Sequence, residues 1–422
     1  MRVSNGKIIV VGGGAAGLMA AGQAAAEGAE VTLVEKMNRV GKKIAISGKG
    51  RCNVTNAGEI TDFVQHYPGN GKFLYASLNE FSNEDLIAFL KENGVETKTE
   101  RGGRVFPVAN EAEVIVTALE KFLKKNKVEI ILGQRVKELI FEKERICGIR
   151  LANGEKLKAR AVIIATGGAS YPGTGSTGDG YELAKMAGHR IIDPFPALVP
   201  LKTSERWPRE LQGLTLKNVE ATIWVEGQKK ATEFGELLFT HFGLSGPIIL
   251  TLSRIAAQAL KENKKVRITI NLKPALSSEQ LDLRLQRDFK KYQNKQFKNS
   301  LNDLLPKSLI PVIVSLSEIP PEKAVHQISK EERKRLGHLL QELGLTVTGT
   351  LGLAMAIVTA GGVDVKEINP STMESRLVKG LYFAGEVIDV DGVTGGYNLQ
   401  AAFATGFKAG RTAAKTVLSE SV

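Results

Sequence analysis

Three glycines near the start of the chain have a spacing that suits phosphate binding. Gly12, Gly14 and Gly17 form a G-x-G-x-x-G pattern, and Glu35 follows downstream. The first glycine permits a tight turn, the second lets the backbone approach a pyrophosphate, and the third lets a helix pack on a strand. Free backbone N–H groups at such a turn attract phosphate. Glu35 would bond both ribose hydroxyls and repel a 2′-phosphate, so the pattern predicts a dinucleotide site that excludes NADP.

The elements around these glycines form a strand–helix–strand unit. Ile8–Val11 is a β-branched run suited to a buried strand, an Ala-rich helix continues to Gly28, and Val31–Val34 is a second strand. Residues 8–26 are nearly uncharged, but they contain several glycines, lack an A-x-A site and are followed by Glu27. We therefore expect a buried strand and helix here rather than a signal peptide, and a cytoplasmic protein with no membrane partner.

Two later signatures favour FAD over NAD. Val136 opens a pair of strand-like runs, and Ala165-Thr166-Gly167-Gly168 follows a buried strand, as in the two-dinucleotide-fold flavoproteins. The stretch LYFAGEVIDVDG resembles the closing signature of those proteins, with Gly385-Glu386 where Gly-Asp is usual. No second G-x-G-x-x-G of this type occurs, so we expect tightly bound, non-covalent FAD, with NAD(P)H only as a transient co-substrate.

Two glycine-rich segments are expected to face the flavin. Residues 41–56, GKKIAISGKGRCNVTN, are predicted to form one loop rich in hydrogen-bond donors. Residues 392–402, GVTGGYNLQAA, are predicted to form a turn and the first turn of a helix. The N-terminal N–H groups of that helix would point at flavin N1 and O2 and favour the negative charge of the reduced form.

The rest of the sequence predicts a discontinuous first domain. A helix at 111–126, a strand at 128–132 and three strand-like runs at 134–158 precede a buried strand at 161–165; prolines then crowd residues 194–208. The fold class is α/β: a Rossmann-like two-dinucleotide-fold FAD domain (1–195 and 346–422), interrupted by a β-rich, barrel-like insert (196–275) and a small helical insert (276–345).

The chain is basic, and much of the excess charge is in the insert. There are 57 Lys and Arg against 45 Asp and Glu, a net charge of +12 over 422 residues. Residues 254–345 hold 18 basic and 10 acidic residues, which predicts either a solvated helical surface or a face for an anionic partner. The 2 cysteines are far apart and the 5 histidines are scattered, so no disulfide scaffold, CxxC redox centre or metal site is expected.

Several long motifs resemble one bacterial flavoprotein family. They are GKKIAISGKGRCNVTN, ATGGASYPGTGSTGDGY, FTHFGLSGPIIL, TAGGV and GLYFAGEVIDVDGVTGGYNLQAAFATG. In this order they resemble the BaiN-like (YhiN-type) NAD(P)/FAD-dependent oxidoreductases over essentially the whole chain. The resemblance implies FAD contacts at Gly12, Gly14, Ala15, Ala16, Gly17, Glu35, Lys36, Gly41, Lys42, Lys43, Ser47, Gly48, Gly50, Arg51, Cys52, Asn53, Val136, Thr166, Gly167, Gly385, Glu386, Gly396, Tyr397, Asn398 and Ala401.

No catalytic acid or base is identified from the sequence, because a flavin carries hydride chemistry by itself. The candidates are His241, in the family motif of the insert, together with Tyr397 and Cys52. Arg51 is expected to lower the pKa of the neighbouring Cys52. Tyr171 is a further candidate donor, and the basic pair in RGGRVFP, Arg101 and Arg104, either holds an anionic substrate or forms a surface loop.

The function predicted from these features is an FAD-dependent oxidoreductase that acts on a small organic substrate by hydride transfer, with NAD(P)H as electron donor. One alternative is a flavin-dependent nucleic-acid (tRNA) modifying protein that grips RNA with the basic insert. Nucleic acid is the less expected partner, because few aromatic residues interleave with the lysines of the insert. The other alternative is a flavin-binding protein without turnover.

Overall fold

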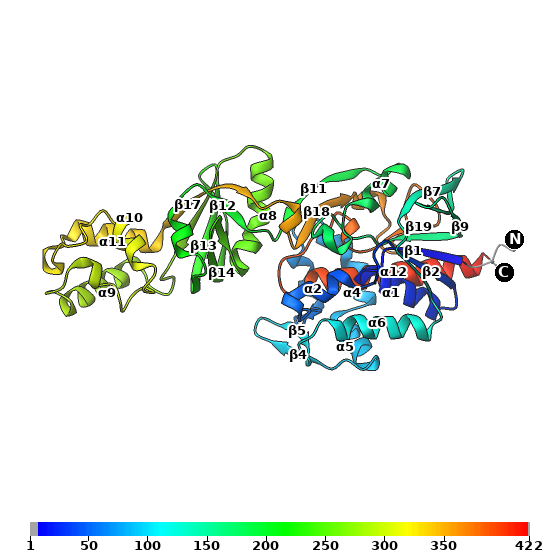
Figure 1. The fold of residues 1–422 in the computed structure, drawn as a ribbon, viewed down its shortest axis with the longest axis horizontal. Helices are drawn as coiled ribbons and strands as arrows, with labels where there is room; N and C mark the ends of the chain where they lie inside the picture. Colours follow the sequence, from blue (N-terminus) through cyan, green and yellow to red (C-terminus); the bar gives the residue numbers. More distant parts are fainter. Residues whose placement is uncertain (1–6, 421–422) are drawn as a thin grey trace. The chain divides into compact units, whose positions relative to one another are not determined.

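The computed structural model describes residues 7–420, which divide into two compact units (Figure 1). The first unit includes the chain up to Pro196 and again from Leu353, and the second is Ala197–Gly352. Each unit has its own cluster of buried apolar side chains. The chain therefore leaves its first unit once, builds the second, and returns.

A parallel five-stranded sheet forms the centre of the first unit. Its strands run in the order β19-β10-β1-β2-β6, and every pairing is parallel. The strands are β1 (Lys7–Val11), β2 (Glu30–Glu35), β6 (Glu129–Leu132), β10 (Ala161–Ile164) and β19 (Leu381–Phe383). All residues of β10 and β19 are buried, as expected where both faces of a parallel sheet are covered. The predicted Rossmann-like class is thus confirmed.

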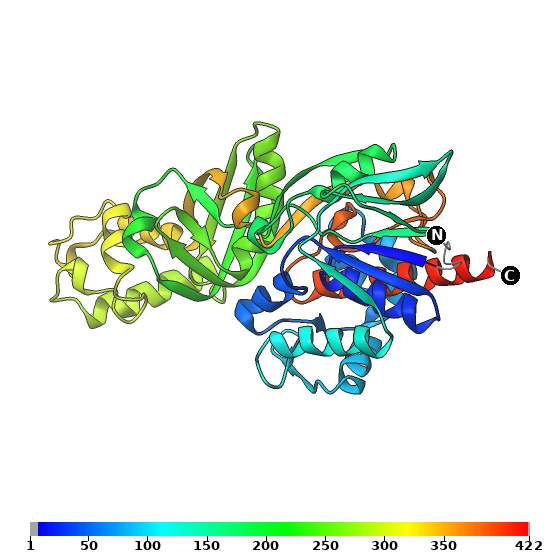
Figure 2. The same ribbon diagram turned by 45° about the vertical axis from the view of Figure 1, so that its right-hand side comes forward.

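Helices cover one face of this sheet and a small antiparallel sheet lies on the other (Figures 1 and 2). The helical layer contains α1 (Ala15–Ala26), α6 (Glu113–Lys125) and α12 (Tyr397–Ser419). The antiparallel sheet consists of β7 (Val136–Glu142), β8 (Arg145–Leu151) and β9 (Lys156–Lys158). This is the layout of a nucleotide-binding domain with its ligand edge at the carboxyl ends of the strands.

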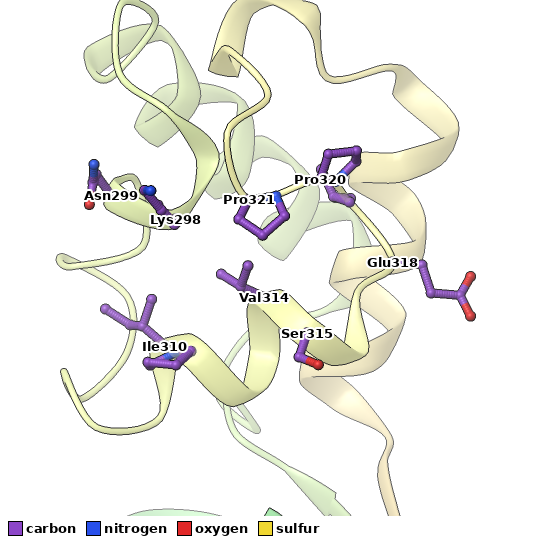
Figure 3. Close-up of a pocket in the computed structure, with 10 residues that line it drawn as sticks. Lys298, Asn299, Ile310, Val314, Ser315, Glu318, Pro320 and Pro321 are labelled. Atoms are coloured by element: carbon purple, nitrogen blue, oxygen red, sulfur yellow. The ribbon is translucent and has the colours of Figure 1, made fainter.

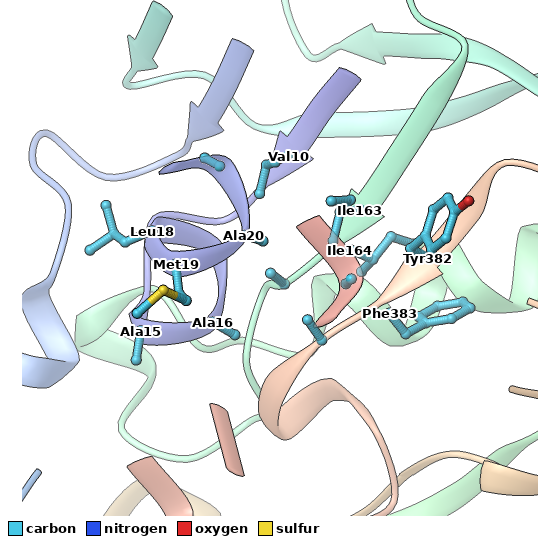
Figure 4. Close-up of a cluster of buried hydrophobic side chains, with 14 of the residues drawn as sticks. Val10, Ala15, Ala16, Leu18, Met19, Ala20, Ile163, Ile164, Tyr382 and Phe383 are labelled. Carbon is cyan, nitrogen blue, oxygen red and sulfur yellow. The ribbon is translucent and has the colours of Figure 1, made fainter. Parts of the chain in front are cut away.

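Helices α1 and α12 touch backbone to backbone. A Cβ added to Gly406 would lie 2.3 Å from the carbonyl oxygen of Ala16, and one on Gly410 would lie 2.3 Å from that of Ala20. Small residues four apart on both helices therefore allow the close approach. Figure 4 shows Ala16 and Ala20 of α1 in the same buried cluster as Ile163 and Ile164 of β10.

The remaining elements of the first unit surround the strand ends. A three-stranded sheet, β3-β5-β4, is formed by Thr55–Asn56, Arg104–Pro107 and Thr97–Glu100. A two-stranded sheet pairs β11 (Ile191–Ala197) with β18 (Val358–Val363). The further helices are α2 (Lys42–Gly50), α3 (Ile60–Phe63), α4 (Tyr75–Glu80), α5 (Asn83–Glu92) and α7 (Asp179–Met186).

The second unit is a closed six-stranded barrel with a helical extension. The barrel order is β12-β15-β14-β13-β16-β17, formed by Leu201–Thr203, Gly243–Ser245, Gln228–Thr240, Thr215–Val225, Val266–Asn271 and Leu343–Thr350. Helix α8 (Pro247–Lys261) packs on β13 and β14. Closure leaves no free sheet edge in the barrel, which protects its strands from edge-to-edge association.

The helical extension contains α9 (Ser278–Lys291), α10 (Ile310–Leu316) and α11 (Lys330–Gln341). Helices α9 and α11 each begin at a serine capping box, at Ser277 and Ser329. A shallow groove runs beside α10, where Ile310 and Val314 face the Pro320-Pro321 turn (Figure 3).

Three expectations about local structure are wrong. The segment 41–56 is not one loop, because its first part is the helix α2. The β-rich insert contains the helix α8, whose buried residues Ile248, Ile249, Leu252 and Ala256 recur at helical spacing after Gly246-Pro247. The second unit also extends past residue 345, because β17 closes the barrel through Thr350.

Within residues 7–420, none of the helices combines the length and the apolar character needed to cross a bilayer.

The contact between α1 and α12 predicts the effect of a single methyl group. Gly410→Ala should lower the free energy of unfolding of the first unit by about 1–3 kcal/mol, because the added Cβ overlaps the Ala20 carbonyl. Gly337→Ala, in the interior of α11, is the control: its nearest neighbour, Leu285, would be 3.7 Å away. That variant should be neutral or stabilising by up to about 1 kcal/mol. Urea unfolding measures both, and equal stability of Gly410→Ala and the parent chain would contradict the packing.

Candidate functional site

The turn between β1 and α1 is packed directly on the end of β10. Gly12 has a φ of 107° and its N–H donates to the Val34 carbonyl at 2.8 Å. A Cβ on Gly12 would lie 2.5 Å from the Ala165 oxygen, and one on Gly17 would lie 1.8 Å from the Gly12 oxygen. These two glycines therefore allow backbone segments to pack closely, which places the start of α1 beside the Ala165-Thr166 turn.

Gly14 has a different environment. Its backbone is extended (φ −84°, ψ −170°), and a Cβ added there would meet no atom within 4 Å. Gly14 is also the N-cap of α1 and supplies no side-chain hydrogen bond, so the first N–H groups of the helix have no side-chain acceptor. The open space in front of these donors is where a pyrophosphate would sit.

The Glu35 carboxylate lies at the end of β2, next to the same turn. Its Oε2 accepts the Gly13 N–H at 2.6 Å and its Oε1 accepts the Met37 N–H at 2.8 Å. A small pocket opens beside it, lined by Val11, Gly12, Val34, Glu35, Lys36, Gln134, Arg135, Val136, Thr166, Gly175, Asp179 and Leu183. The pocket brings the glycine turn, the acidic strand end and Val136 together beside Glu35, whose carboxylate suits a ribose.

Charged side chains form one wall of this pocket. Lys36 contacts Asp179 at 2.9 Å, and Arg135 contacts the other oxygen of Asp179 at 2.8 Å. Burial would raise the pKa of Asp179, but the hydrogen bonds from Lys36 and Thr177 hold it below its ordinary value. Lys36 is thus engaged by a side chain of the first unit and is oriented along the pocket rather than free in solution.

Helix α2 brings the next segment against the glycine turn. The Gly41 N–H donates to the Gly13 carbonyl at 2.8 Å, and Gly41 has a φ of 71°. Near its end the helix is interrupted: Gly48, Lys49 and Gly50 all have left-handed backbones, as does Cys52 at φ 57°. A left-handed Lys or Cys is strained, and such strain collects at ligand sites.

The side chains of residues 51–53 face three different ways. Arg51 pairs with Glu100 and lies over the Phe106 ring, 4.2 Å from its centroid. Cys52 is fully buried, and burial raises its pKa to about 12, so the expected activation by Arg51 is wrong. The buried Oδ1 of Asn53 has no hydrogen-bond partner among the described residues. A buried acceptor without a partner is costly, and a bound ligand with an N–H donor would satisfy it.

The two segments that were expected to face a flavin lie side by side. A Cβ on Gly396 would lie 2.3 Å from the Thr55 oxygen, and the Asn56 Nδ2 donates to the Gly395 carbonyl at 3.1 Å. The Thr55 hydroxyl donates to Gln400 Oε1 at 2.8 Å. The structure therefore brings residues 51–56 and 394–400 together, although they are far apart in sequence.

A second network connects the strand-end turns around Glu386. Lys43 Nζ lies 2.8 Å from Glu386 Oε2 and 2.7 Å from Ser170 Oγ. Ser170 Oγ and the Thr359 N–H both donate to Glu386 Oε1, at 2.9 and 2.8 Å. Burial would raise the pKa of Glu386, but the Lys43 charge and these hydrogen bonds keep it below its ordinary value. Glu386 is thus an anion that holds α2, β18 and the 166–170 turn together.

Tyr397 is enclosed by aromatic side chains at the start of α12. The Tyr67 hydroxyl donates to its carbonyl at 2.8 Å, and the His66 ring stacks on its ring with 4.2 Å between centroids. Burial lowers the pKa of His66, which favours the neutral imidazole. Asn398 bonds both the N–H and the carbonyl of Gly392 and shapes the preceding loop. Gly396 caps the helix at φ 104° without a side-chain acceptor.

The other candidates lie at turns of the chain. His241 is exposed in the second unit, at the β14–β15 turn. Arg101 and Arg104 are exposed at the β4–β5 turn, where Arg104 bonds the Arg101 carbonyl. Tyr171 is half-buried at φ 50°. The remaining expected contacts lie on described helices or at strand-end turns: Ala15 and Ala16 on α1, Lys42 and Ser47 on α2, Ala401 on α12, Gly167 in the turn after β10 and Gly385 after the end of β19.

Sequence reasoning missed three residues of the cluster. Ser170 and Thr359 bond Glu386 or its neighbours, and His66 stacks on Tyr397. Ser170 follows closely on the Thr166-Gly167-Gly168 turn, so its place in that motif was a usable signal. Thr359 and His66 carry no signal in the sequence, because only the folded chain brings them to these partners.

These features together fit FAD. The open backbone at Gly14 suits a pyrophosphate, and the Glu35 carboxylate next to it suits a ribose. The Asn53 Oδ1, which has no partner among the described residues, lies in the segment beside the start of α12. The uncapped N-terminus of α12 offers N–H donors and a positive dipole end to an electron-rich ring edge.

Comparison with known proteins agrees with this picture. The family model described as the HI0933-like protein Rossmann domain matches residues 6–412. A 3-dehydro-bile acid delta(4,6)-reductase of Clostridium scindens is 34% identical over 411 residues, covering 97% of this chain and 99% of the relative. A ribosomal RNA dihydrouridine synthase of Haemophilus influenzae is 33% identical over 404 residues, covering 94% and 96%.

Solved structures show the same fold at low identity. A 3-ketosteroid delta1-dehydrogenase from Sterolibacterium denitrificans aligns with a TM-score of 0.53 at 15% identity, covering 97% of this chain and 99% of that one. A 3-ketosteroid-delta4-(5alpha)-dehydrogenase from Rhodococcus jostii RHA1 aligns with a TM-score of 0.52 at 16% identity, covering 98% of both chains.

The open space at Gly14 predicts a variant that folds but binds FAD poorly. Gly14→Val suits the extended backbone, and its Cβ would meet no atom within 4 Å, so the apoprotein should lose no more than about 1 kcal/mol, the usual cost of a poor N-cap. Its FAD affinity should fall at least about tenfold, because the side chain blocks phosphate from the N–H donors. Quenching of flavin fluorescence on titration measures the affinity, and unchanged FAD binding would contradict the assignment.

The burial of Cys52 predicts that its thiol reacts slowly with alkylating reagents in the folded chain. With a pKa of about 12, almost none of this thiol is ionised at pH 8, so iodoacetamide should label it only after unfolding. A Cys147→Ser background isolates the signal, and mass spectrometry counts the adducts. Rapid labelling of the folded chain at pH 8 would show that Cys52 is an activated thiol.

Proposed function

Since the chain belongs to the HI0933-like Rossmann family and is an FAD-dependent oxidoreductase, we propose that it reduces a carbon–carbon double bond conjugated to a carbonyl group. The names of two relatives support this reaction. A 3-dehydro bile acid with delta(4,6) unsaturation and the uracil base of uridine both contain such a bond. The carbonyl makes the far carbon of the bond electron-poor, and therefore a hydride acceptor.

The residues of the chain would bind and orient the cofactor. When bound, FAD supplies a hydride that it receives from NAD(P)H. The N–H groups at the start of α1 would hold the pyrophosphate, and Glu35 the ribose. The N-terminus of α12 would stabilise negative charge at the pyrimidine edge of the ring. The packing of Tyr397 against its aromatic neighbours would hold the start of α12 in place, and the Lys43–Glu386 pair would hold α2.

We propose uridine in ribosomal RNA as the substrate, in place of the small organic molecule expected from the sequence. Two relatives at 33% identity are named ribosomal RNA dihydrouridine synthases, and this chain covers 95% or more of each. The net charge of +12 suits a polyanionic partner. The observation that supports the reaction itself is that the open backbone at Gly14, the Glu35 carboxylate and the N-terminus of α12 all lie in the first unit.

A small conjugated ketone is the second candidate substrate. It is favoured by the relative at 34% identity that is named as a bile acid reductase. Both candidates need the same cofactor chemistry, so they differ only in whether an RNA base or a small ketone binds next to the flavin. NAD(P)H as the donor belongs to both proposals.

One anaerobic experiment distinguishes these candidates. The purified chain should be yellow, and NADH or NADPH should bleach its flavin. Addition of ribosomal RNA from cells that lack the gene should restore the colour and form dihydrouridine, counted by mass spectrometry after nuclease digestion. Gly14→Val is the control and should form none. Reoxidation by a 3-keto-4,6-diene steroid but not by RNA would favour the second candidate, and a chain that binds no flavin would overturn both.

A further inference from the structure

The barrel of the second unit carries a row of alternating basic and aromatic side chains. Trp224 on β13 pairs with Lys229 on β14 and with Arg267 on β16. Directly opposed residues in antiparallel strands project to the same face, with Cβ atoms about 4.5–5.5 Å apart. Trp224 therefore lies between Lys229 and Arg267 in one row across three strands.

This row lies on the outer face of the barrel. The neighbours of Trp224 along β13, Ile223 and Val225, are buried in the core of the second unit, whereas Lys229 and Arg267 are exposed and Trp224 is half-buried. A bulge after Ile223 shifts the register so that Trp224 opposes Lys229, while Ile223 opposes Ala231. The bulge places Lys229 on the same face as the indole.

The side chains of the row are held in place. Trp224 Nε1 donates to Thr269 Oγ1 at 2.9 Å, which fixes the indole over β16. The Arg267 guanidinium lies over Gly344 of β17, where an added Cβ would be 2.4 Å from its Nη2. A glycine at that position gives the guanidinium room to lie flat along the sheet. A preorganised indole and guanidinium lose little entropy when a ligand binds.

The surroundings favour an anionic, aromatic ligand. Within residues 7–420, neither Lys229 nor Arg267 has an acidic partner within ion-pair distance. The same face continues through the Thr222–Thr232 pair to Phe234, which is 57% exposed. Two carboxylates share the face near Phe234, those of Glu220, which is opposite Phe234, and of Glu236, two residues further along β14. Exposed aromatic rings flanked by cations bind nucleobases by stacking and phosphates by charge.

We propose that Trp224, Lys229 and Arg267 form a docking site for single-stranded RNA, with a base stacked near the indole and phosphates against the two cations. The proposal rests on the proposed function, and it names the surface that grips the substrate. Neighbouring strands lie about 4.8 Å apart, so a chain that crosses the row meets a cation on each side of the aromatic ring. The expectation that few aromatics accompany the basic residues holds along the sequence but not across the strands.

The test measures RNA binding by the full, flavin-loaded chain. The probe is a fluorescein-labelled single-stranded RNA of about 16 nucleotides, followed by anisotropy at several salt concentrations. Trp224→Ala should weaken binding about tenfold or more at every salt concentration, whereas Trp224→Phe should keep most of the affinity. Arg267→Gln and Lys229→Gln should each reduce the salt dependence, by a slope of about 0.7 for a single strand. Lys121→Gln, an exposed lysine of α6, is the matched control and should bind as the parent chain does.

The outcomes separate the docking site from the proposed function. Flavin content and bleaching by NADPH are measured on each variant, so that a folding defect is recognised. If Trp224→Ala binds RNA as tightly as the parent while both form dihydrouridine, the docking site is wrong and the function stands. If the parent binds RNA through Trp224 but forms no dihydrouridine, the docking site stands without the proposed reaction. If the parent binds no RNA, or a protein partner protects the Trp224 face instead, the RNA proposal is overturned.

Discussion

The contact between the Gly12–Gly17 turn and the end of β10 determines the arrangement of the whole first unit. Side chains at Gly12 or Gly17 would overlap the Ala165 and Gly12 carbonyls, so only glycine lets two strand-end turns meet there. Gly385, at the end of β19, meets Ala16 of the same helix in a similar way. The carboxyl ends of the adjacent parallel strands β1, β10 and β19 therefore lie close together. Ligands of such sheets bind at this edge, so the arrangement suits a nucleotide.

A single charge pair keeps the segments around that edge together. Glu386 accepts hydrogen bonds from Lys43, Ser170 and the Thr359 backbone, and its pKa stays below the ordinary value although burial opposes ionisation. An anion in this position is stable because every donor around it is already oriented. The resemblance implies an FAD contact at Glu386, and its partners within the chain also make it the residue that positions α2 and the 166–170 turn.

The sequence predicted the parts of the fold that depend on local patterns. The β-branched run at Ile8–Val11, the glycine turn and Glu35 gave the first strand–helix–strand unit, and the parallel sheet follows from it. It did not predict α8, whose Ile- and Leu-rich start is compatible with a strand until its contacts with the barrel are known. The predicted lowering of the Cys52 pKa was wrong because burial of the thiol raises it, and because Arg51 turns to Glu100 and Phe106 instead. Both depend on residues far away in sequence. The Trp224 row was missed for the same reason, since its members come from three strands.

The measurement that tests the central claim most directly is an experimental structure of the chain with FAD. The account predicts phosphate oxygens within hydrogen-bond distance of the N–H groups that follow Gly14, the adenosine ribose beside Glu35, and the flavin ring against Gly396 and Asn53. A pyrophosphate bound elsewhere, or a flavin ring remote from the start of α12, would contradict it.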